Sequence, residues 1–345
     1  MVPRLLGLST AVPPFKLRQG DVMERAGALF DERTREDLAR LLPVYANAGI
    51  ETRYSCVPLE WYEESHGWAE KNRLYLDNAV TLMETAALDC LGGAGLEVTD
   101  VDTIISVSSS GIATPSLDAL LAERVGMRRD LQRLPIFGLG CAGGVLGLAR
   151  AAAMALALPG SKVLLTVVEL CGLTFRRADQ SNSNLVATAL FGDGAAAALV
   201  STDGDGPALA SWGEHTWPGS LQVMGWRVED DGFSVQFSRE IPAIIRARFR
   251  PALDDFLGRQ GLRLADIDHF LCHPGGAKVM DALEQVFGLS PGSLGLSRDV
   301  LREYGNMSAA TIMFVLEKAM GEDGRSLLSA LGPGFSAGFM IVEGA

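Results

Sequence analysis

Three glycine-flanked turns in this 345-residue chain carry side chains that could do chemistry, and the first surrounds a cysteine. Cys141 lies in the segment FGLGCAGG, between a short apolar run and a strongly apolar helical stretch. The dipole and unpaired N–H groups of a helix start favour a thiolate there, which predicts a nucleophile. The glycines at 138, 140 and 143 also match the dinucleotide-binding pattern GxGxxG, with Glu169 near the distance expected of a ribose-binding acid. A third interpretation is that Cys141 is a small buried hydrophobe, and the turn alone leaves all three open.

The second turn follows an apolar strand that ends at His273 and leads through Pro-Gly-Gly into a helix. Ligands of open α/β sheets lie at the carboxyl ends of strands, so His273 is the best candidate for a base among the four histidines. The others, His66, His215 and His269, are more simply interpreted as surface or hydrogen-bonded residues.

The third turn, YGNMSAA, places Asn306 at the start of a helix. Asparagine after glycine is an ordinary helix N-cap, but its amide could equally donate a hydrogen bond to a developing oxyanion. A thiol, an imidazole and a carboxamide together form a set suited to nucleophilic acyl transfer. The chain has no GxxxxGK[ST] loop, HExxH, GxSxG or EF-hand pattern.

The composition excludes several other classes of protein. Thirty basic and forty-two acidic residues give a formal charge of -12, so we expect no nucleic-acid partner. Five cysteines without CxxC spacing argue against a disulfide framework and a metal site, and favour reduced thiols in the cytoplasm. Uncharged stretches such as residues 326–342 are interrupted by Gly332-Pro333-Gly334, so no membrane insertion is expected.

An alternation of apolar strands and helices must position the three turns. Strands without a polar face imply sheets covered by helices on both sides, so we predict an α/β fold. The pattern restarts after a Gly/Asp-rich stretch, residues 201–207, and this suggests two similar halves in five layers, residues 1–205 and 206–345. The predicted strands are the N-terminal segment and residues 102–109, 134–137, 162–168, 195–200 and 267–272, with one more on either side of Gly332-Pro333-Gly334. The predicted helices are residues 78–91, 116–124, 142–158, 239–257, 277–287 and 307–320.

Several motifs in order along nearly the whole chain resemble the type III polyketide synthases, the chalcone-synthase-like branch of the thiolase superfamily. They are GCAGG, VVELCGLTFRR, ALFGDGAAAALV, CHPGGAK, YGNMSAA and LGPGFSAGF. The related ketoacyl synthases of fatty-acid initiation usually carry HQAN at the histidine, whereas His273 is followed by Pro-Gly-Gly. The resemblance implies a thiolase-like five-layered αβαβα fold and a homodimer.

The resemblance also implies a role for each turn. Cys141 would hold the starter and the growing chain as a thioester, and His273 beside it would keep the thiolate as an ion pair. His273 and Asn306 would bind the malonyl thioester oxygen during decarboxylation. Phe191 matches the family's gatekeeping phenylalanine, although the motif by itself suits a core aromatic residue.

The positions expected around the substrate differ in part from the plant enzymes. Thr114 stands where a plant methionine crosses the dimer interface, and Cys171 and Val235 replace threonine and phenylalanine. The full set of expected pocket residues is Thr114, Glu169, Cys171, Thr174, Phe191, Val235, Ser308, Gly332, Pro333 and Gly334. Arg53 is the residue retained from the basic coenzyme A entrance.

The sequence therefore predicts an acyltransferase that condenses malonyl-CoA onto an acyl-CoA or acyl-carrier-protein starter and needs no cofactor. The segment around Trp226 resembles bacterial members that accept long acyl chains and make alkylpyrones or alkylresorcinols. The alternatives are a tetrahydroxynaphthalene-type synthase, a carrier-protein-dependent ketoacyl synthase and, from another class, an NAD-dependent oxidoreductase using residues 138–143.

Overall fold

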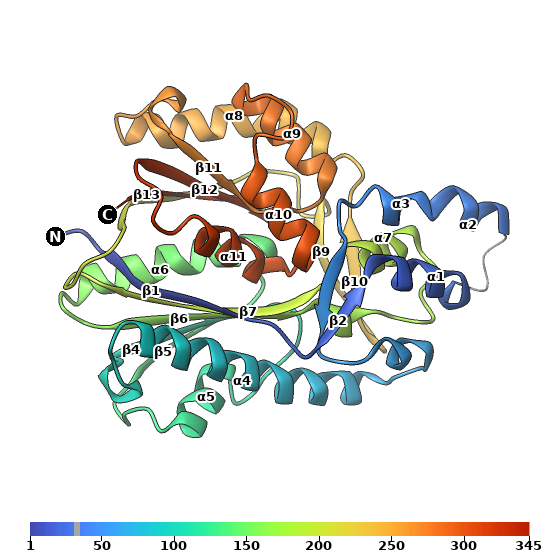
Figure 1. Cartoon of the computed structure of the whole chain (residues 1–345), viewed down its shortest axis with the longest axis horizontal. Coiled ribbons are helices and arrows are strands. Elements are labelled where there is room, and N and C mark those ends of the chain that lie inside the picture. Colours follow the sequence, from blue (N-terminus) through green and yellow to red (C-terminus); the bar gives the residue numbers. More distant parts are fainter. Residues whose placement is uncertain (31–34, 345) are drawn as a thin grey trace.

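The two parts of one long sheet alternate with three layers of helices in the computed structural model, which describes residues 1–30 and 35–344 (Figure 1). The strands are β1 (Arg4–Ala11), β2 (Phe15–Arg18), β3 (Thr52–Ser55), β4 (Thr103–Val107), β5 (Gln132–Ile136), β6 (Val163–Leu170), β7 (Asp193–Ser201), β8 (Ala208–Thr216), β9 (Met224–Glu229), β10 (Gly232–Phe237), β11 (His269–Cys272), β12 (Arg325–Gly332) and β13 (Ser336–Glu343). The helices are α1 (Gln19–Leu29), α2 (Arg35–Leu41), α3 (Pro43–Ala46), α4 (Trp68–Gly93), α5 (Leu117–Val125), α6 (Gly143–Ala157), α7 (Asn182–Leu190), α8 (Ile241–Arg259), α9 (Ala277–Phe287), α10 (Gly295–Tyr304) and α11 (Thr311–Lys318).

The main sheet of the described residues has nine strands in the order β11-β12-β13-β8-β1-β7-β6-β4-β5. Its two parts are joined through β1 and β8 by the pair Arg4↔Ala208. Helices α4 and α5 cover the outer face of the N-terminal part, α6 and α11 lie between the parts, and α8 and α9 cover the C-terminal part (Figure 1). The predicted five-layered α/β fold is confirmed, and the predicted boundary at 205/206 falls between β7 and β8.

The core explains why the central strands are apolar on both faces. Along β7, Ala195, Ala197 and Leu199 pack toward α4, whereas the residues between them pack into the middle layer. Helix α6 fills that middle layer. The segment Gly140–Ala157 is apolar and long enough to cross a membrane by composition, but 72% of it is buried inside the molecule, as expected of a core helix.

Several predicted elements differ from those observed. No element was expected over residues 208–237, where β8, β9 and β10 alternate polar and apolar residues and have partly exposed faces. The helix predicted from Met307 is wrong at its start, because Ser308 has a φ of 47° and a 3₁₀ turn precedes α11 at Thr311. That left-handed conformation is rare for a residue with a side chain and marks a strained position.

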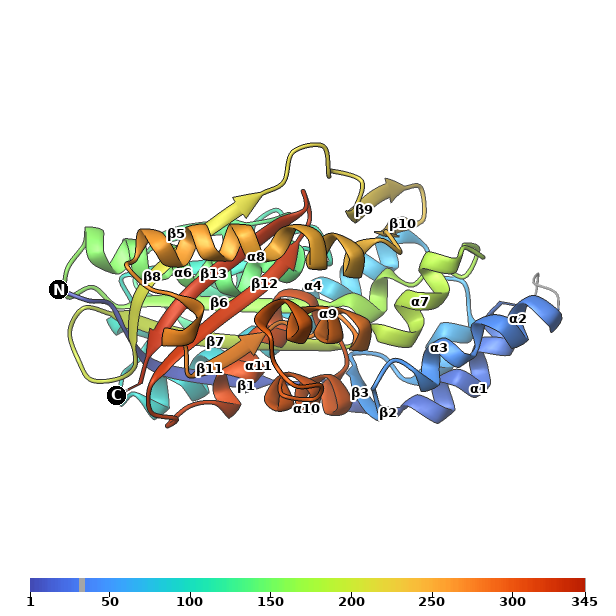
Figure 2. The same ribbon diagram turned by 90° about the horizontal axis from the view of Figure 1, so that it is seen from above.

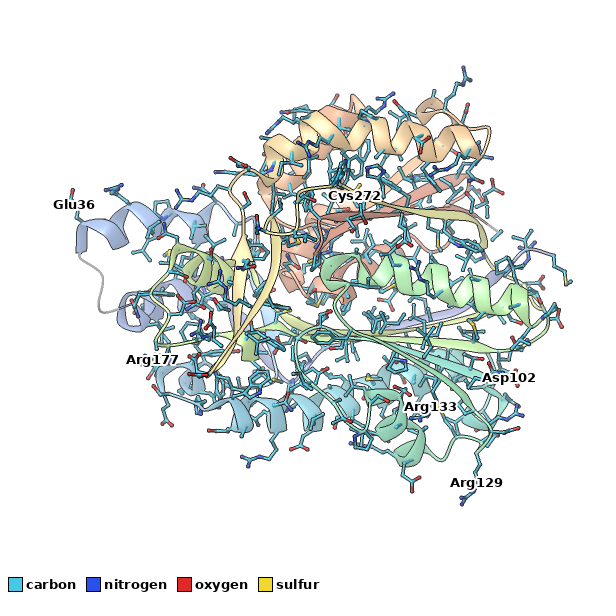
Figure 3. All side chains as sticks on the ribbon, turned by 180° about the vertical axis from the view of Figure 1, so that it is seen from behind. Glu36, Asp102, Arg129, Arg133, Arg177 and Cys272 are labelled. Carbon is cyan, nitrogen blue, oxygen red and sulfur yellow. The ribbon has the colours of Figure 1, made fainter. Side chains whose placement is uncertain are left out.

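Helices α1, α2 and α3 lie with α7 at the end of the molecule opposite the two termini (Figures 1 and 2). Charged side chains such as Asp102, Arg129 and Arg133 lie at the periphery (Figure 3). Cys272 lies in β11, and all five cysteines are buried and unpaired.

Candidate active site

Cys141 lies in a 3₁₀ turn, Gly140–Ala142, that leads directly into α6. The turn is held by Ser109, whose Oγ accepts hydrogen bonds from the backbone N–H groups of Gly138 and Gly140, both at 3.1 Å. Ser109 was not predicted as a site residue. Its signal in the sequence is a run of three serines directly after the buried strand β4, where polar side chains reach the sheet edge.

Gly140 and Gly143 of this turn serve close packing within the protein, whereas Gly138 is open to an added Cβ but has a φ of 92°, which favours glycine. A Cβ at Gly140 would lie 2.6 Å from Pro333 Cδ, and one at Gly143 would lie 2.7 Å from Val107 Cγ1. Because protein atoms occupy these places, the GxGxxG pattern is explained without a dinucleotide.

His273 follows the last residue of β11 and is 4% exposed. Its backbone N–H donates to the carbonyl oxygen of Ser329 at 2.8 Å, which fixes the start of the Pro-Gly-Gly turn. Both ring nitrogens are buried and have no hydrogen-bond partner among the residues that the structure describes. Buried polar groups nearly always form hydrogen bonds, so a buried imidazole without a hydrogen-bond partner indicates a group that can bind a ligand.

Asn306 is held by its backbone and by one side-chain oxygen. Its N–H donates to Leu190 O at 2.8 Å, and its carbonyl accepts from Gly192 N at 3.0 Å. The side-chain Oδ1 accepts from the N–H of Ser308 at 2.8 Å. The amide nitrogen is therefore the part of this side chain that can donate into the site, as an oxyanion donor must.

Cys141, His273 and Asn306 line one cavity of ≈ 580 Å³. They come from three separate strand-to-helix or loop-to-helix junctions, and the folded chain brings them to the same place. The structure therefore places the predicted thiol, imidazole and carboxamide together.

The electrostatics of the cavity disfavour any lone charge. Burial raises the pKa of the Cys141 thiol to about 12, and hydrogen bonds from Ser308 and Asn306 act in the opposite direction. Burial also lowers the pKa of His273 to about 3. A thiolate and an imidazolium formed together would compensate each other's charge, and this is the ion pair that the family resemblance predicts.

Glu169 lies fully buried behind the cysteine. Its carboxylate accepts hydrogen bonds from Ser109 N at 3.0 Å and from Ser308 Oγ at 3.3 Å. Burial raises the pKa of Glu169 to about 7. This carboxyl joins Ser109, which holds the Cys141 turn, to Ser308, whose N–H donates to Asn306 Oδ1.

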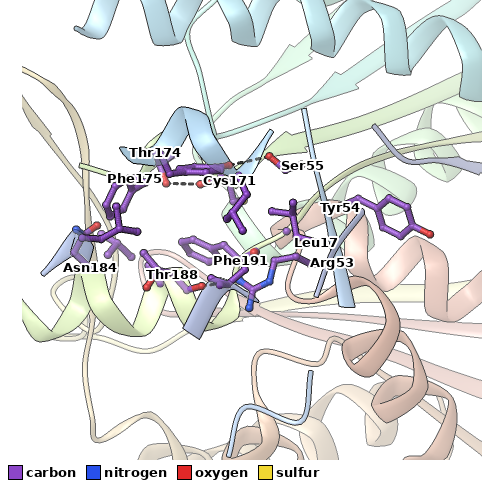
Figure 4. A pocket seen from close by; sticks show the side chains of 18 residues that line it. Leu17, Arg53, Tyr54, Ser55, Cys171, Thr174, Phe175, Asn184, Thr188 and Phe191 are labelled. Carbon is purple, nitrogen blue, oxygen red and sulfur yellow. Dashed lines mark hydrogen bonds between the residues drawn. The ribbon is translucent and has the colours of Figure 1, made fainter. Parts of the chain in front are cut away.

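A smaller cavity of ≈ 60 Å³ lies beside Phe191 and is lined by four of the ten predicted pocket residues, Cys171, Thr174, Phe191 and Val235 (Figure 4). Cys171 and Thr174 lie across it from Phe191 and Thr188, and Val235 of β10 also lines it. Phe191 is wedged against the rings of Trp226 and Phe237, with centroids 5.9 and 5.7 Å away. The rest of the wall is mainly aliphatic and aromatic, with Leu17, Val22, Leu29, Leu59 and Phe175.

The remaining predicted pocket residues line neither cavity. Thr114 is exposed in the loop after β4, and Glu169 and Ser308 lie behind the cysteine as described. Gly332 ends β12, Pro333 and Gly334 begin the turn into β13, and a Cβ at Gly332 would lie 2.4 Å from Leu139 O. This turn therefore supports the Cys141 turn from behind.

Arg53 does not lie at a surface entrance. It is 4% exposed in the wall of the smaller cavity, and its guanidinium is engaged with backbone carbonyls. The larger cavity instead has exposed Arg40, Arg239 and Lys278 on its lining and no carboxylate among its described lining residues. These cations were missed because they are ordinary surface residues in the sequence; their one signal is that Arg239 and Lys278 lie at the starts of predicted helices.

Comparisons with known proteins agree along the whole chain. The chalcone and stilbene synthase N-terminal domain matches residues 4–204, and the C-terminal domain of the same family matches residues 209–344. The "putative chalcone synthase" of Bacillus subtilis (strain 168) is 37% identical over 98% of this chain and 97% of its own length. The 1,3,6,8-tetrahydroxynaphthalene synthase of Streptomyces peucetius subsp. caesius is 39% identical over 97% and 91%. The crystal structure of 1,3,6,8-tetrahydroxynaphthalene synthase from Streptomyces coelicolor A3(2) superposes with a TM-score of 0.94 and 29% identity, covering 99% of each chain.

The five layers and the cysteine, histidine and asparagine in one cavity define an acyltransferase of thiolase-like fold. The chain belongs to the chalcone and stilbene synthase family, and the protein is a type III polyketide synthase. This decides against the NAD-dependent oxidoreductase and the ketoacyl synthase of fatty-acid initiation.

Proposed function

We propose that the protein holds an acyl starter on Cys141 and extends it with malonyl-CoA by decarboxylative Claisen condensation. The observation that carries this proposal is that Cys141 shares a cavity with Asn306 and with His273, whose two ring nitrogens lack partners. Buried donors without partners are suited to bind an oxygen that becomes charged during the reaction.

The first half of the cycle loads the enzyme. The Cys141 sulfur attacks the carbonyl carbon of the acyl-CoA thioester while its proton moves to His273. The tetrahedral intermediate collapses, the bond to the coenzyme A sulfur breaks, and that sulfur takes the proton from His273. The product is an acyl group on Cys141 with His273 neutral again.

The second half extends the chain. The bond between C2 of the malonyl group and its carboxylate breaks, CO₂ leaves, and the electron pair forms a thioester enolate. His273 and Asn306 donate hydrogen bonds to the enolate oxygen, where the charge develops. The enolate carbon then attacks the Cys141 thioester, a new carbon–carbon bond forms, and the Cys141 sulfur leaves. None of these steps needs a metal or an organic cofactor.

We further propose an aliphatic starter and an alkylpyrone or resorcinol-type product, because the wall of the smaller cavity is mainly apolar. A second candidate is a tetrahydroxynaphthalene-type product, favoured by the 39% identity to a synthase of that name. Mass spectrometry of the products formed from malonyl-CoA and a panel of aliphatic and aromatic starters distinguishes the two candidate product classes. Incorporation of an aliphatic acyl-CoA supports the first candidate, and a product built from malonyl-CoA alone, with every other starter ignored, would contradict it.

Arg239 and Lys278 are proposed to bind the phosphates of coenzyme A at the mouth of the larger cavity. Lys278 lies in the first turn of α9, where the unpaired backbone N–H groups also favour an anion. Such local cations allow a chain of charge -12 to bind a polyanionic substrate. An acidic carrier protein could use the same cations to deliver its starter.

Arg239→Ala and Lys278→Ala are each expected to raise KM for malonyl-CoA roughly fivefold with little change in kcat, the effect of losing one exposed ion pair. The increase should shrink at high salt, because salt screens exposed charges. Arg259→Ala, at the opposite end of α8, is the matched control and should leave KM unchanged. A KM that does not respond to either cation would rule out this phosphate site, and steady-state kinetics with acyl-carrier-protein and acyl-CoA donors would show which starter source depends on it.

We also propose that the protein is a homodimer in the cytoplasm. Strand β5 is an exposed sheet edge, and the apolar residues Ile112, Leu134 and Phe137 nearby are 46%, 37% and 59% exposed. Exposed apolar side chains beside an unpaired strand edge are typical of an interface. Light scattering should give twice the mass of the chain, and a monomer at micromolar concentration would contradict the dimer. The cytoplasmic location accords with five unpaired thiols and is testable by cell fractionation.

A further inference from the structure

Arg53, in β3, is a buried cation held mainly by backbone carbonyls. Its Nη1 donates to Thr188 O at 2.7 Å and to Phe191 O at 2.8 Å, and its Nη2 donates to Ala189 O at 2.9 Å. Burial lowers the pKa of Arg53 to about 10, so the side chain stays charged at neutral pH. Burying a charge costs free energy unless hydrogen bonds or opposite charges compensate it, and among the described residues Asp193 is the carboxylate that acts on Arg53, without forming an ion pair with it.

The three carbonyls belong to the end of α7 and the residue that follows it. The last carbonyl groups of a helix have no partner within the helix, and a cation there is favoured by the helix dipole. Gln19 completes the arrangement, because its Nε2 donates to Ala189 O at 3.0 Å and its Oε1 accepts from Arg53 Nη2. Arg53 and Gln19 therefore fix the backbone that presents Phe191 (Figure 4).

The same backbone pairs with the segment that carries Asn306. Leu190 O accepts from Asn306 N, Gly192 N donates to Asn306 O, and Phe191 and Asn306 form a parallel bridge. A Cβ at Gly192 would lie 2.4 Å from Tyr304 O, so only glycine allows the two segments to approach this closely. Added Cβ atoms at Gly192 and at Gly305 would each lie 3.4 Å from Arg53 Cβ, so the stem of Arg53 packs against this crossing.

We infer that Arg53 is a positioning residue that acts through Asn306 and Phe191, setting the place of the amide donor and of the aromatic wall together. This inference rests on the role of Asn306 proposed above. It has a selective consequence, because Arg53 hydrogen bonds to the segment that holds Asn306 and has no hydrogen bond to Cys141 or His273. Decarboxylation, which needs Asn306, should depend on Arg53, whereas acylation of Cys141 should not.

The test compares two rates in the Arg53→Lys variant. Lysine keeps the charge but cannot reproduce the planar, forked donor set that reaches three carbonyls and Gln19. We expect CO₂ release from malonyl-CoA to fall about tenfold, as a small misplacement of a catalytic group does, with Cys141 acylation by acyl-CoA unchanged. In an Asn306→Ala background, Arg53→Lys should cause no further loss of decarboxylation, because the group it positions is gone.

Arg325→Lys is the matched control. It removes a comparable set of hydrogen bonds, to Asp266 O and Glu343, at the far end of β12, and should leave both rates unchanged. If Arg53→Lys does not fold, Gln19→Leu tests the same contact with a smaller expected loss.

Three results would overturn the inference: an equal loss of acylation and decarboxylation, no loss of decarboxylation, or a further loss in the Asn306→Ala background. Failure of the proposed function is recognised separately, because Asn306→Ala alone would then decarboxylate malonyl-CoA at the wild-type rate.

Discussion

Cys141→Ala is expected to abolish acylation of the enzyme and polyketide synthesis. The sulfur is the atom to which the starter and every intermediate would be attached, so its removal leaves no covalent route, and activity should fall by at least about 10⁴-fold. Intact-protein mass spectrometry after incubation with an acyl-CoA should show one adduct on the wild type and none on the variant. The side chain is buried among small residues at the start of α6, so alanine should be accommodated without loss of the fold.

Cys90→Ala is the matched control for this experiment. Cys90 is equally buried and unpaired but lies in α4, packed against the outer face of the N-terminal sheet. Burial raises the pKa of Cys90 to about 12, as it does for Cys141, so a raised thiol pKa does not by itself distinguish the two. The adduct should persist in Cys90→Ala; an adduct that persists in Cys141→Ala would exclude Cys141 as the nucleophile.

His273→Ala and Asn306→Ala should each lower malonyl-CoA decarboxylation by about 10²- to 10³-fold, the usual effect of removing one donor to a developing oxyanion. The two variants should differ in acylation, because His273 is the proposed acceptor of the Cys141 proton and Asn306 is not. Asn306→Ala is therefore expected to form the acyl-enzyme adduct, and His273→Ala to form it slowly. Release of CO₂ at the wild-type rate by both variants would show that neither residue binds the enolate oxygen.

The pH dependence of Cys141 alkylation tests the same assignment in the absence of substrate. Burial holds the pKa of a lone Cys141 thiol at about 12, and a raised thiol pKa means that the reactive thiolate appears only as the pH increases. In His273→Ala, which removes the proposed acceptor of the thiol proton, the alkylation rate at pH 7 should be low and rise about tenfold per pH unit up to pH 10. In the wild type, proton transfer to His273 should make the rate higher and nearly independent of pH near neutrality. Identical pH profiles in the two proteins would contradict the pairing.

The strands that the sequence predicted best are those with no polar face. Strands β6 and β7 are buried along their whole length between two helix layers, so hydrophobicity alone reveals them. The hairpin of β9 and β10 was not predicted, because its exposed positions break the apolar run and its packing partners, such as Phe191, lie in the other half of the chain. The sequence also predicted a helical conformation for Ser308, which is wrong for the same reason. Its left-handed backbone is accompanied by hydrogen bonds to Asn306 and to Glu169, which is distant in the sequence.

By itself, the sequence determined the α/β class, the three chemical groups Cys141, His273 and Asn306, and the family. It could do so because each group lies in a turn whose glycine or proline residues are visible locally, and because several such turns occur in a specific order. The tertiary structure decided which charged side chains line the larger cavity and which are buried within the protein. The sequence predicted Arg53 at the coenzyme A entrance on the surface, but this residue is buried among the carbonyls at the end of α7. The cations that line the larger cavity are Arg40, Arg239 and Lys278. The physical reason is that burial and charge compensation depend on segments far apart in the chain, which a local pattern of residue types does not contain.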